Sequence, residues 1–181
     1  MHPKPSLLRT LVAGIAGGAA AVLGTFVTFA QLSGSRRGEE GLLFDPDTQH
    51  EKVIAVWKEI EPLPRVIETP AVLLVGLLAF GIAYAFLYRS VGPAWPAGIH
   101  RRAWRLAVIV LIATAFSEFM GSFNVLHQPL YLSAIGQAFW AVSAFAQAYA
   151  LVYLLDRGRP EPKSHGTGRG GAAAAQATVD A

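Results

Sequence analysis

The residue with the clearest chemical potential is Glu118, a lone carboxylate near the middle of an apolar run that spans residues 105–126. A charged side chain at the centre of a membrane costs about 2.5 to 3.5 kcal/mol or more, so such residues usually face protein or a functional site. Because burial disfavours the charged form of a carboxyl group, we expect Glu118 to be protonated at rest. It then either fastens two helices together or serves as a protonatable coupling group.

Helical periodicity places Glu118 on the face of its helix that carries small and hydroxyl-bearing side chains. A tight hairpin at residues 124–129 leads into the next apolar run. Reflection about this turn places Glu118 level with residues 137–140, so we expect Gln137 to be its partner and Asn124 to meet Ser133. The candidate polar membrane site consists of Glu118, Gln137, Asn124, Ser122, Ser133 and His127.

The residue types give little support for redox, metal-dependent or catalytic chemistry. The chain has no cysteine, which excludes disulfides, thiol redox chemistry and Cys-based zinc or iron–sulfur sites. Its histidines lie at termini or in connections, where they cannot serve as buried haem ligands, and His127 is badly placed to act with Glu118 as a catalytic pair. The polar cluster at residues 45–51 matches no metal-binding motif, so we interpret it as a solvated turn. We expect no enzyme activity, no metal and no cofactor.

Composition indicates a membrane protein. The chain has 181 residues, of which 53% are hydrophobic and 15% charged, and its mean hydropathy is +0.41. Four apolar blocks are each long enough to cross the hydrocarbon core of a bilayer, which takes about 20 helical residues. Because lipid offers no hydrogen-bond partners to the backbone, these blocks must be helices. The expected fold is all-α, an integral membrane four-helix bundle.

Apolar runs and charged connections predict the boundaries along the chain. We expect a cytoplasmic N-terminus (1–10), transmembrane helix 1 (11–32), an extracytoplasmic loop (33–69) with an amphipathic helix at about 49–60, transmembrane helix 2 (70–88), a basic cytoplasmic loop (89–105), transmembrane helix 3 (106–126), an outer hairpin (127–129), transmembrane helix 4 (130–155) and a disordered cytoplasmic tail (156–181). A cleaved signal peptide is the alternative to a retained first span, and the length of the first run favours retention.

Small residues line one side of the first span. This helix-packing seam comprises Gly14, Gly17, Gly18, Ala21 and Gly24. Such stripes let helix backbones approach closely in a membrane. We interpret the seam as a packing surface within this protein, with dimerisation as the alternative.

The loop between the first two spans contains a short amphipathic segment. Thr48 and Glu51 have the spacing of a capping box, so a helix is expected to start near Gln49. Its apolar side, Val53, Val56, Trp57 and Ile60, forms an interfacial cap. A helix of this kind lies on the membrane surface or covers the end of the bundle.

Basic residues predict the orientation. The N-terminus, the loop at 89–105 and the tail carry ten Lys or Arg residues, against five on the other side. This bias places both termini in the cytoplasm, in a membrane of the bacterial inner (plasma) membrane type. The basic residues sit at helix ends, which favours lipid headgroups over nucleic acid as partners.

The expected role is a structural or interaction component of a membrane assembly. It would form a homo- or hetero-oligomer through small-residue helix faces. The alternative is a small proton-coupled or ion-conducting transporter in which Glu118 is the coupling group.

Overall fold

The computed structural model describes residues 5–33 and 41–157, and all regular secondary structure in this part of the chain is helical. Four helical segments there are long and apolar enough to cross a membrane: Leu7–Leu32, Ala71–Ala94, Ile99–Val125 and Leu130–Asp156. The expected all-α architecture with four apolar spans is therefore confirmed. It identifies the chain as an integral membrane protein by the length and composition of its helices.

Each span consists of one long helix, and three of them end in a shorter helical turn of different pitch. The elements are α1 (Leu7–Thr25) with the π-helical η1 (Phe26–Leu32), α4 (Ala71–Val91) with the 3-10 turn η4 (Gly92–Ala94), α5 (Ile99–Glu118) with the π-helical η5 (Phe119–Val125), and α6 (Leu130–Asp156). A wider π-helical turn shifts the direction of the side chains that follow it. This shift matters at η5, which continues directly from Glu118.

The helices extend further than hydropathy indicates. Most of the expected loop at 89–105 is helical, because α4 continues to Val91 and α5 already begins at Ile99. Long arginine side chains can reach toward water from within a helix end, so a basic residue need not terminate the helix. The predicted disordered tail lies, from residue 158 onward, outside the described residues.

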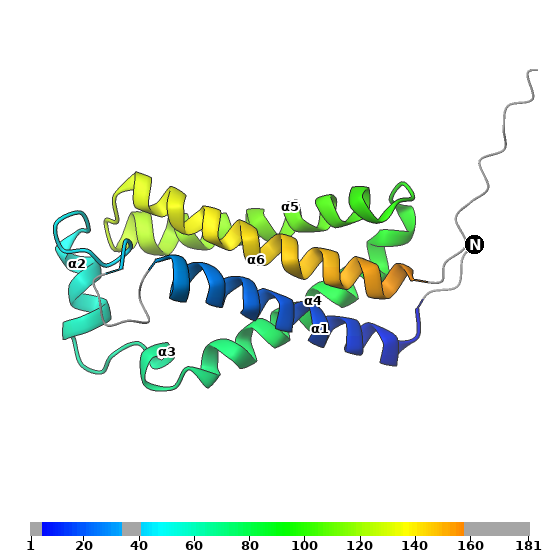
Figure 1. The fold of residues 1–181 in the computed structure, drawn as a ribbon, viewed down its shortest axis with the longest axis horizontal. Helices are drawn as coiled ribbons and strands as arrows, with labels where there is room; N and C mark the ends of the chain where they lie inside the picture. Colours follow the sequence, from blue (N-terminus) through cyan, green and yellow to red (C-terminus); the bar gives the residue numbers. More distant parts are fainter. Residues whose placement is uncertain (1–4, 34–40, 158–181) are drawn as a thin grey trace, which may run out of the picture.

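The four spans form an open arrangement, because α4 and α5 do not pack along each other as they would in a closed four-helix bundle. α1 packs along both α4 and α6, while α5 packs along α6 (Figure 1). α4 and α5 approach each other near their connection, where Tyr88, Leu106 and Val110 belong to one core cluster. Towards their other ends the two helices separate (Figure 1). One side of the molecule is therefore open between α4 and α5.

The small-residue seam of α1 is occupied by its neighbours within the chain. A Cβ atom added at Gly14 would lie 2.6 Å from the Cα of Ile82, and one at Gly18 would lie 2.7 Å from the Cα of Leu78, both in α4. On the side of α6, Gly17 faces Leu151. Gly24 and Ala21 are also buried. The seam thus lets the backbone of α1 approach its neighbours closely. Since α4 and α6 occupy the seam, it is covered within the single chain.

A short helical segment covers the end of the bundle that is remote from the termini. It consists of α2 (Glu51–Ile54) and the π-helical η3 (Ala55–Glu59), and α3 (Arg65–Glu68) then leads into α4. We call this the cap end (Figure 1), and we call the opposite end the termini end. Of the expected apolar side chains, Val53 is buried, Val56 and Trp57 are half-buried, and Ile60 is exposed after the helix has ended.

The capping box predicted at the start of this segment is replaced by a different cap. His50 Nδ1 accepts a hydrogen bond from the backbone N–H of Lys52 at 3.1 Å, and the helix begins at Glu51. The Thr48 hydroxyl instead donates to the carbonyl of Asp45 at 3.4 Å, within the preceding turn. Because the Thr48 hydroxyl bonds within the turn that precedes the helix, His50 caps the helix in place of Thr48.

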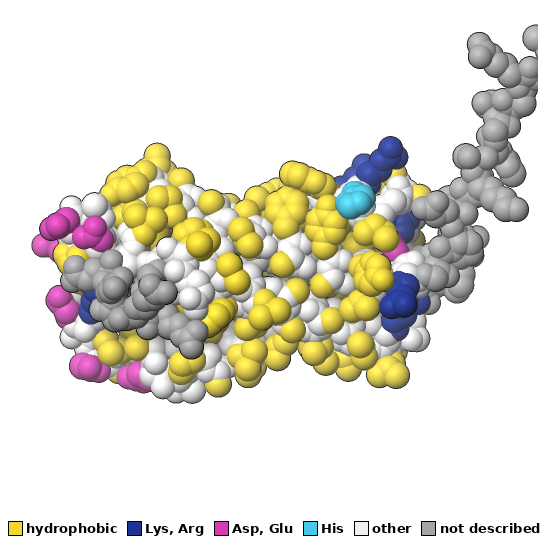
Figure 2. Space-filling view, in the orientation of Figure 1, with side chains coloured by type: hydrophobic (Ala, Val, Ile, Leu, Met, Phe, Trp, Pro, Cys, Tyr) yellow, Lys and Arg dark blue, Asp and Glu magenta, His cyan; other side chains and the backbone are white. Residues whose placement is uncertain are grey.

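Charge separates along the long axis of the bundle. Among the described residues, acidic side chains are in excess at the cap end, with Asp45, Asp47, Glu51, Glu59, Glu61 and Glu68 against Lys52, Lys58 and Arg65, whereas basic side chains are in excess at the termini end, with Arg9, Arg89, Arg101, Arg102, Arg105 and Arg157 against Asp156. On the visible face, charged side chains gather at the two ends, mostly acidic at the cap end and mostly basic at the termini end, and the belt between them is largely apolar and shows no charged side chain (Figure 2). Such a belt is what a membrane-spanning bundle presents to lipid.

Candidate functional site

Glu118 is held at the junction of α5 and α6. It is the last residue of α5 and is half-buried. Gln128 Nε2 donates to Glu118 Oε1 at 3.2 Å, and the Ser122 hydroxyl donates to the same carboxylate. Opposite it, a Cβ at Gly136 of α6 would lie 3.3 Å from Glu118 Oε1. The glycine therefore makes room for the carboxylate against α6.

The partner of Glu118 differs from the one that helical periodicity predicts. Gln137 Nε2 donates to the carbonyl of Leu111 at 3.1 Å and to Thr114 Oγ1 at 3.2 Å, one to two turns before Glu118 along α5. The prediction that Gln137 pairs with Glu118 is wrong, because the reflection assumed an ideal hairpin with no side chain returning from the turn. In the structure, the side chain of Gln128 points back from the turn and bonds to the carboxylate.

The hairpin geometry explains how Gln128 reaches the carboxylate. The preceding residue, His127, has a φ of 59°, and the backbone N–H of Gln128 donates to the carbonyl of Ser122 at 3.0 Å. This left-handed residue reverses the chain and directs Gln128 back into the bundle, where its Nε2 also donates to Ser133 Oγ at 3.1 Å. Ser133 is thus met by Gln128. The predicted contact with Asn124 is wrong, because Asn124 is exposed and makes no hydrogen bond with Ser133, which is buried and accepts from Gln128.

Gln128 also joins the carboxylate to the cap. Its Oε1 accepts from Gln49 Nε2 at 3.3 Å, and the amide of Gln49 further contacts the carbonyl of Leu43 and the N–H of His50. Both glutamines are less than one-tenth exposed. Buried amide groups with several partners each hold adjoining segments in register. A continuous hydrogen-bonded chain therefore runs from Glu118 to the cap.

The imidazole side chains of the two histidines near the hairpin are separate from this hydrogen-bonded chain. The rings of His50 and His127 lie 5.6 Å apart between centroids, and both residues are exposed. His127 accordingly does not join Glu118 in one site. In the described residues, no three His, Asp or Glu side chains are grouped so as to hold a metal ion.

A groove of about 430 Å³ opens beside Glu118, between the separated parts of α4 and α5. Trp140 of α6 contributes to its lining. Its α5 side carries the polar side chains Thr114, Ser117 and Glu118, whereas its α4 side is apolar. The apolar lining comprises Val66, Val72, Leu73, Gly76, Leu77, Phe80 and Ala113. The groove thus combines one carboxylate with a largely apolar surface at membrane depth.

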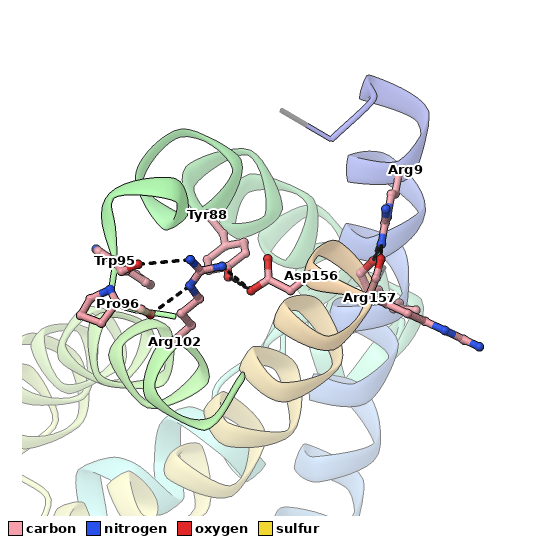
Figure 3. Close-up of polar contacts among 8 residues, drawn as sticks. Arg9, Tyr88, Trp95, Pro96, Arg102, Asp156 and Arg157 are labelled. Carbon is pink, nitrogen blue, oxygen red and sulfur yellow. Dashed lines mark hydrogen bonds and ion pairs between the residues drawn. The ribbon is translucent and has the colours of Figure 1, made fainter. Parts of the chain in front are cut away.

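A second polar cluster, not expected from the sequence, joins three helices at the termini end (Figure 3). The guanidinium of Arg102 in α5 forms a 2.7 Å ion pair with Asp156 in α6, and the Tyr88 hydroxyl in α4 donates to the same carboxylate at 2.7 Å. Arg102 also donates to the backbone carbonyls of Trp95 and Pro96. Asp156 is the one acidic residue at this end among the described residues, which was the available clue to its pairing.

The first span is fastened to the same end by a separate contact. Arg9 donates through Nε and Nη2 to the carbonyl of Leu154 at 2.9 and 2.7 Å, and it also donates to the carbonyl of Arg157 (Figure 3). Carbonyls in the last turn of a helix lack intrahelical partners, and basic side chains commonly satisfy them. Arg9 therefore terminates α6 while tying α1 to it.

Comparisons with protein-family models, with curated proteins and with solved structures found no match to this chain. Any assignment of function therefore rests on the geometry of the bundle.

Proposed function

We propose that the protein is a non-catalytic component of a membrane assembly and that a transmembrane helix of another protein packs into the α4–α5 groove. The observation that carries this proposal is the open side of the bundle, where α4 and α5 separate and the groove is lined by apolar side chains. Helix association in membranes depends on close packing and on interhelical hydrogen bonds. The groove offers both, because Ser117 and Glu118 lie along one wall.

Charge complementarity favours a different protein over a second copy. Apart from Glu118, the charged side chains of the four spans lie near the termini end. A second copy therefore has no cation at the depth of Glu118. A partner helix with a Lys, Arg or amide side chain at that depth would pair with the carboxylate, and polar residues within spans usually find such partners.

The surface expected to bind a partner is therefore the groove between α4 and α5, in place of the small-residue seam of α1. The glycines of α1 already pack against α4 and α6, so they are not the surface offered to a partner. The groove wall instead includes a glycine, Gly76, where an added Cβ would meet nothing within 4 Å. Open space at this position suits an incoming side chain.

Site-specific photo-crosslinking tests the proposal, and because the sequence contains no cysteine, an introduced cysteine is the single thiol of this chain that a maleimide can label. Ser117→Cys carrying a benzophenone maleimide is irradiated in native membranes. We expect one discrete protein adduct that disappears when Gly76→Phe fills the groove. Gly121→Phe is the matched control, because its position also has open space but does not line the groove. An adduct with the mass of two copies, an adduct that survives Gly76→Phe, or lipid adducts alone would overturn the proposal.

We further propose that both termini lie in the cytoplasm of a bacterial inner (plasma) membrane. The separation of basic and acidic side chains between the two ends supports this orientation, since cytoplasmic ends are enriched in Lys and Arg. The packing of α1 against both α4 and α6 supports a first span that is retained in the mature protein.

A second candidate function is a proton-coupled transporter that uses Glu118. The observation that favours it is the chain of side-chain amides from Glu118 through Gln128 to Gln49 at the cap end. A transporter of this kind moves protons by itself, without a partner protein, which distinguishes it from a component of a membrane assembly.

A further inference from the structure

A shallow hollow of about 500 Å³ lies on the outward side of α5 near the termini end. It is lined by Trp95, Trp104, Arg105, Val108 and Ile109. Tryptophan is typical of the boundary between lipid and water, and the two apolar residues continue along α5 towards the membrane interior. The hollow therefore spans the depth from headgroup to acyl chain.

Two arginines beside this hollow lack protein acceptors within the described part of the chain. Arg9 and Arg102 are held by carbonyls and by Asp156, respectively. By contrast, Arg101 and Arg105 make no hydrogen bond or ion pair with any residue of the described ranges, and both are exposed. Since they are four residues apart, they lie one turn apart on the same side of α5. Two positive charges thus face outward together.

The walls of the hollow are fixed in place before any ligand binds. The carbonyl of Trp95 accepts from Arg102 Nη2 at 3.2 Å, and its ring lies 5.8 Å from that of Tyr88 between centroids (Figure 3). The ring of Trp104 packs edge-on against Phe145 at 4.7 Å. The Arg102 cluster therefore holds one wall of the hollow, and α6 supports another.

We propose that this hollow binds one anionic phospholipid from the leaflet at the termini end. The phosphate lies against Arg105 and Arg101, since guanidinium groups bind phosphate oxygens through paired hydrogen bonds. An acyl chain follows Val108 and Ile109. A free phosphate ion would use the two arginines but would leave the apolar wall and both tryptophans without a role, so the geometry selects a lipid.

Tryptophan quenching by brominated lipids tests this site in the full-length protein. The protein is reconstituted in phosphatidylcholine vesicles that contain increasing fractions of dibrominated phosphatidylglycerol, and fluorescence is compared with that in dibrominated phosphatidylcholine. We expect a preference for phosphatidylglycerol of about thirtyfold from the two arginines, because each nearby basic residue strengthens anionic lipid binding by about fivefold. In the double variant Arg101→Gln, Arg105→Gln this preference falls to about one.

Control variants separate the site from general charge effects and from misfolding. Arg65→Gln removes an exposed arginine at the cap end and leaves the preference unchanged. The double variant Arg101→Lys, Arg105→Lys keeps both charges and retains most of the preference, which covers the case in which the glutamine variant fails to fold. A preference that survives in the folded glutamine variant, or is lost in the lysine variant, overturns the proposal. Relief of quenching by millimolar inorganic phosphate at constant ionic strength also overturns it, because the site would then take a free anion.

Discussion

At the scale of single residues, Glu118 is defined by the groups around its carboxylate. Gln128 and Ser122 donate to it, and Gly136 leaves space for it against α6. Periodicity predicted that Glu118 lies on the small and hydroxyl-bearing face of its helix, but it could not identify the donor. Gln128 lies in the turn, where its direction depends on the left-handed conformation of His127 and on the π-helical end of the preceding span. Neither feature follows from a hydrophobic repeat.

A double-mutant cycle checks this assignment. We expect the cycle between Glu118→Ala and Gln128→Ala to give a coupling energy of about 0.6 to 1.7 kcal/mol, the range for polar pairs inside membrane proteins. The matched cycle between Glu118→Ala and Gln137→Ala should give a coupling near zero, because Gln137 bonds to Leu111 and Thr114 instead. The measurement is the free energy of unfolding in mixed detergent. The reverse order of the two couplings would show that the carboxylate pairs with Gln137.

At the scale of the elements, the contact between α1 and α4 depends on glycine. A Cβ at Gly81 of α4 would lie 2.4 Å from both the carbonyl oxygen of Gly14 and the amide nitrogen of Gly18. Backbone atoms cannot move aside as a flexible side chain can, so any larger residue must separate the helices. The four spans themselves were predictable, because each carries a strong signal over about 20 residues. Which helix faces which was not, because it depends on contacts between residues far apart in the sequence.

Substitution of this glycine tests the helix contact. We expect Gly81→Ala to destabilise the protein by about 1 to 3 kcal/mol, the usual cost of overpacking a tight interior. Gly76→Ala in the same helix is the control, since its Cβ would meet nothing within 4 Å, and it should leave stability unchanged or slightly raised. Thermal unfolding followed by size-exclusion chromatography compares the two variants. Equal melting temperatures would contradict the close approach of α1 and α4.

At the scale of the whole molecule, the bundle has charged ends, an apolar belt and one open side. Hydropathy and charge counts predicted the belt and the separation of basic residues, because both are sums over many positions. The open side was not predicted, since no local pattern reports that α4 and α5 diverge. The pairing of Arg102 with Asp156 was likewise missed: the isolated acidic residue was a clue that Asp156 has a basic partner, but which arginine it meets, 54 residues away in the sequence, depends on how α5 packs against α6.

Single-cysteine labelling tests the orientation of the whole molecule. Asp47→Cys is exposed at the cap end and Ser90→Cys is exposed near the termini end, in a chain with no other cysteine. We expect a membrane-impermeant maleimide to label the cap-end cysteine in intact cells and to label the other only after permeabilisation. The opposite pattern would place the termini outside the cytoplasm.

The central claim, that Glu118 supports association and does not carry protons, is tested most directly by proton flux into proteoliposomes. Purified protein and its Glu118→Gln variant are reconstituted separately, a potassium gradient with valinomycin drives protons inward, and an internal pH-sensitive dye reports their entry. We expect equal fluxes for the two proteins, both no greater than that of protein-free vesicles. A flux above this leak in the original protein that is lost in a folded Glu118→Gln variant would instead establish that Glu118 carries protons in a transporter.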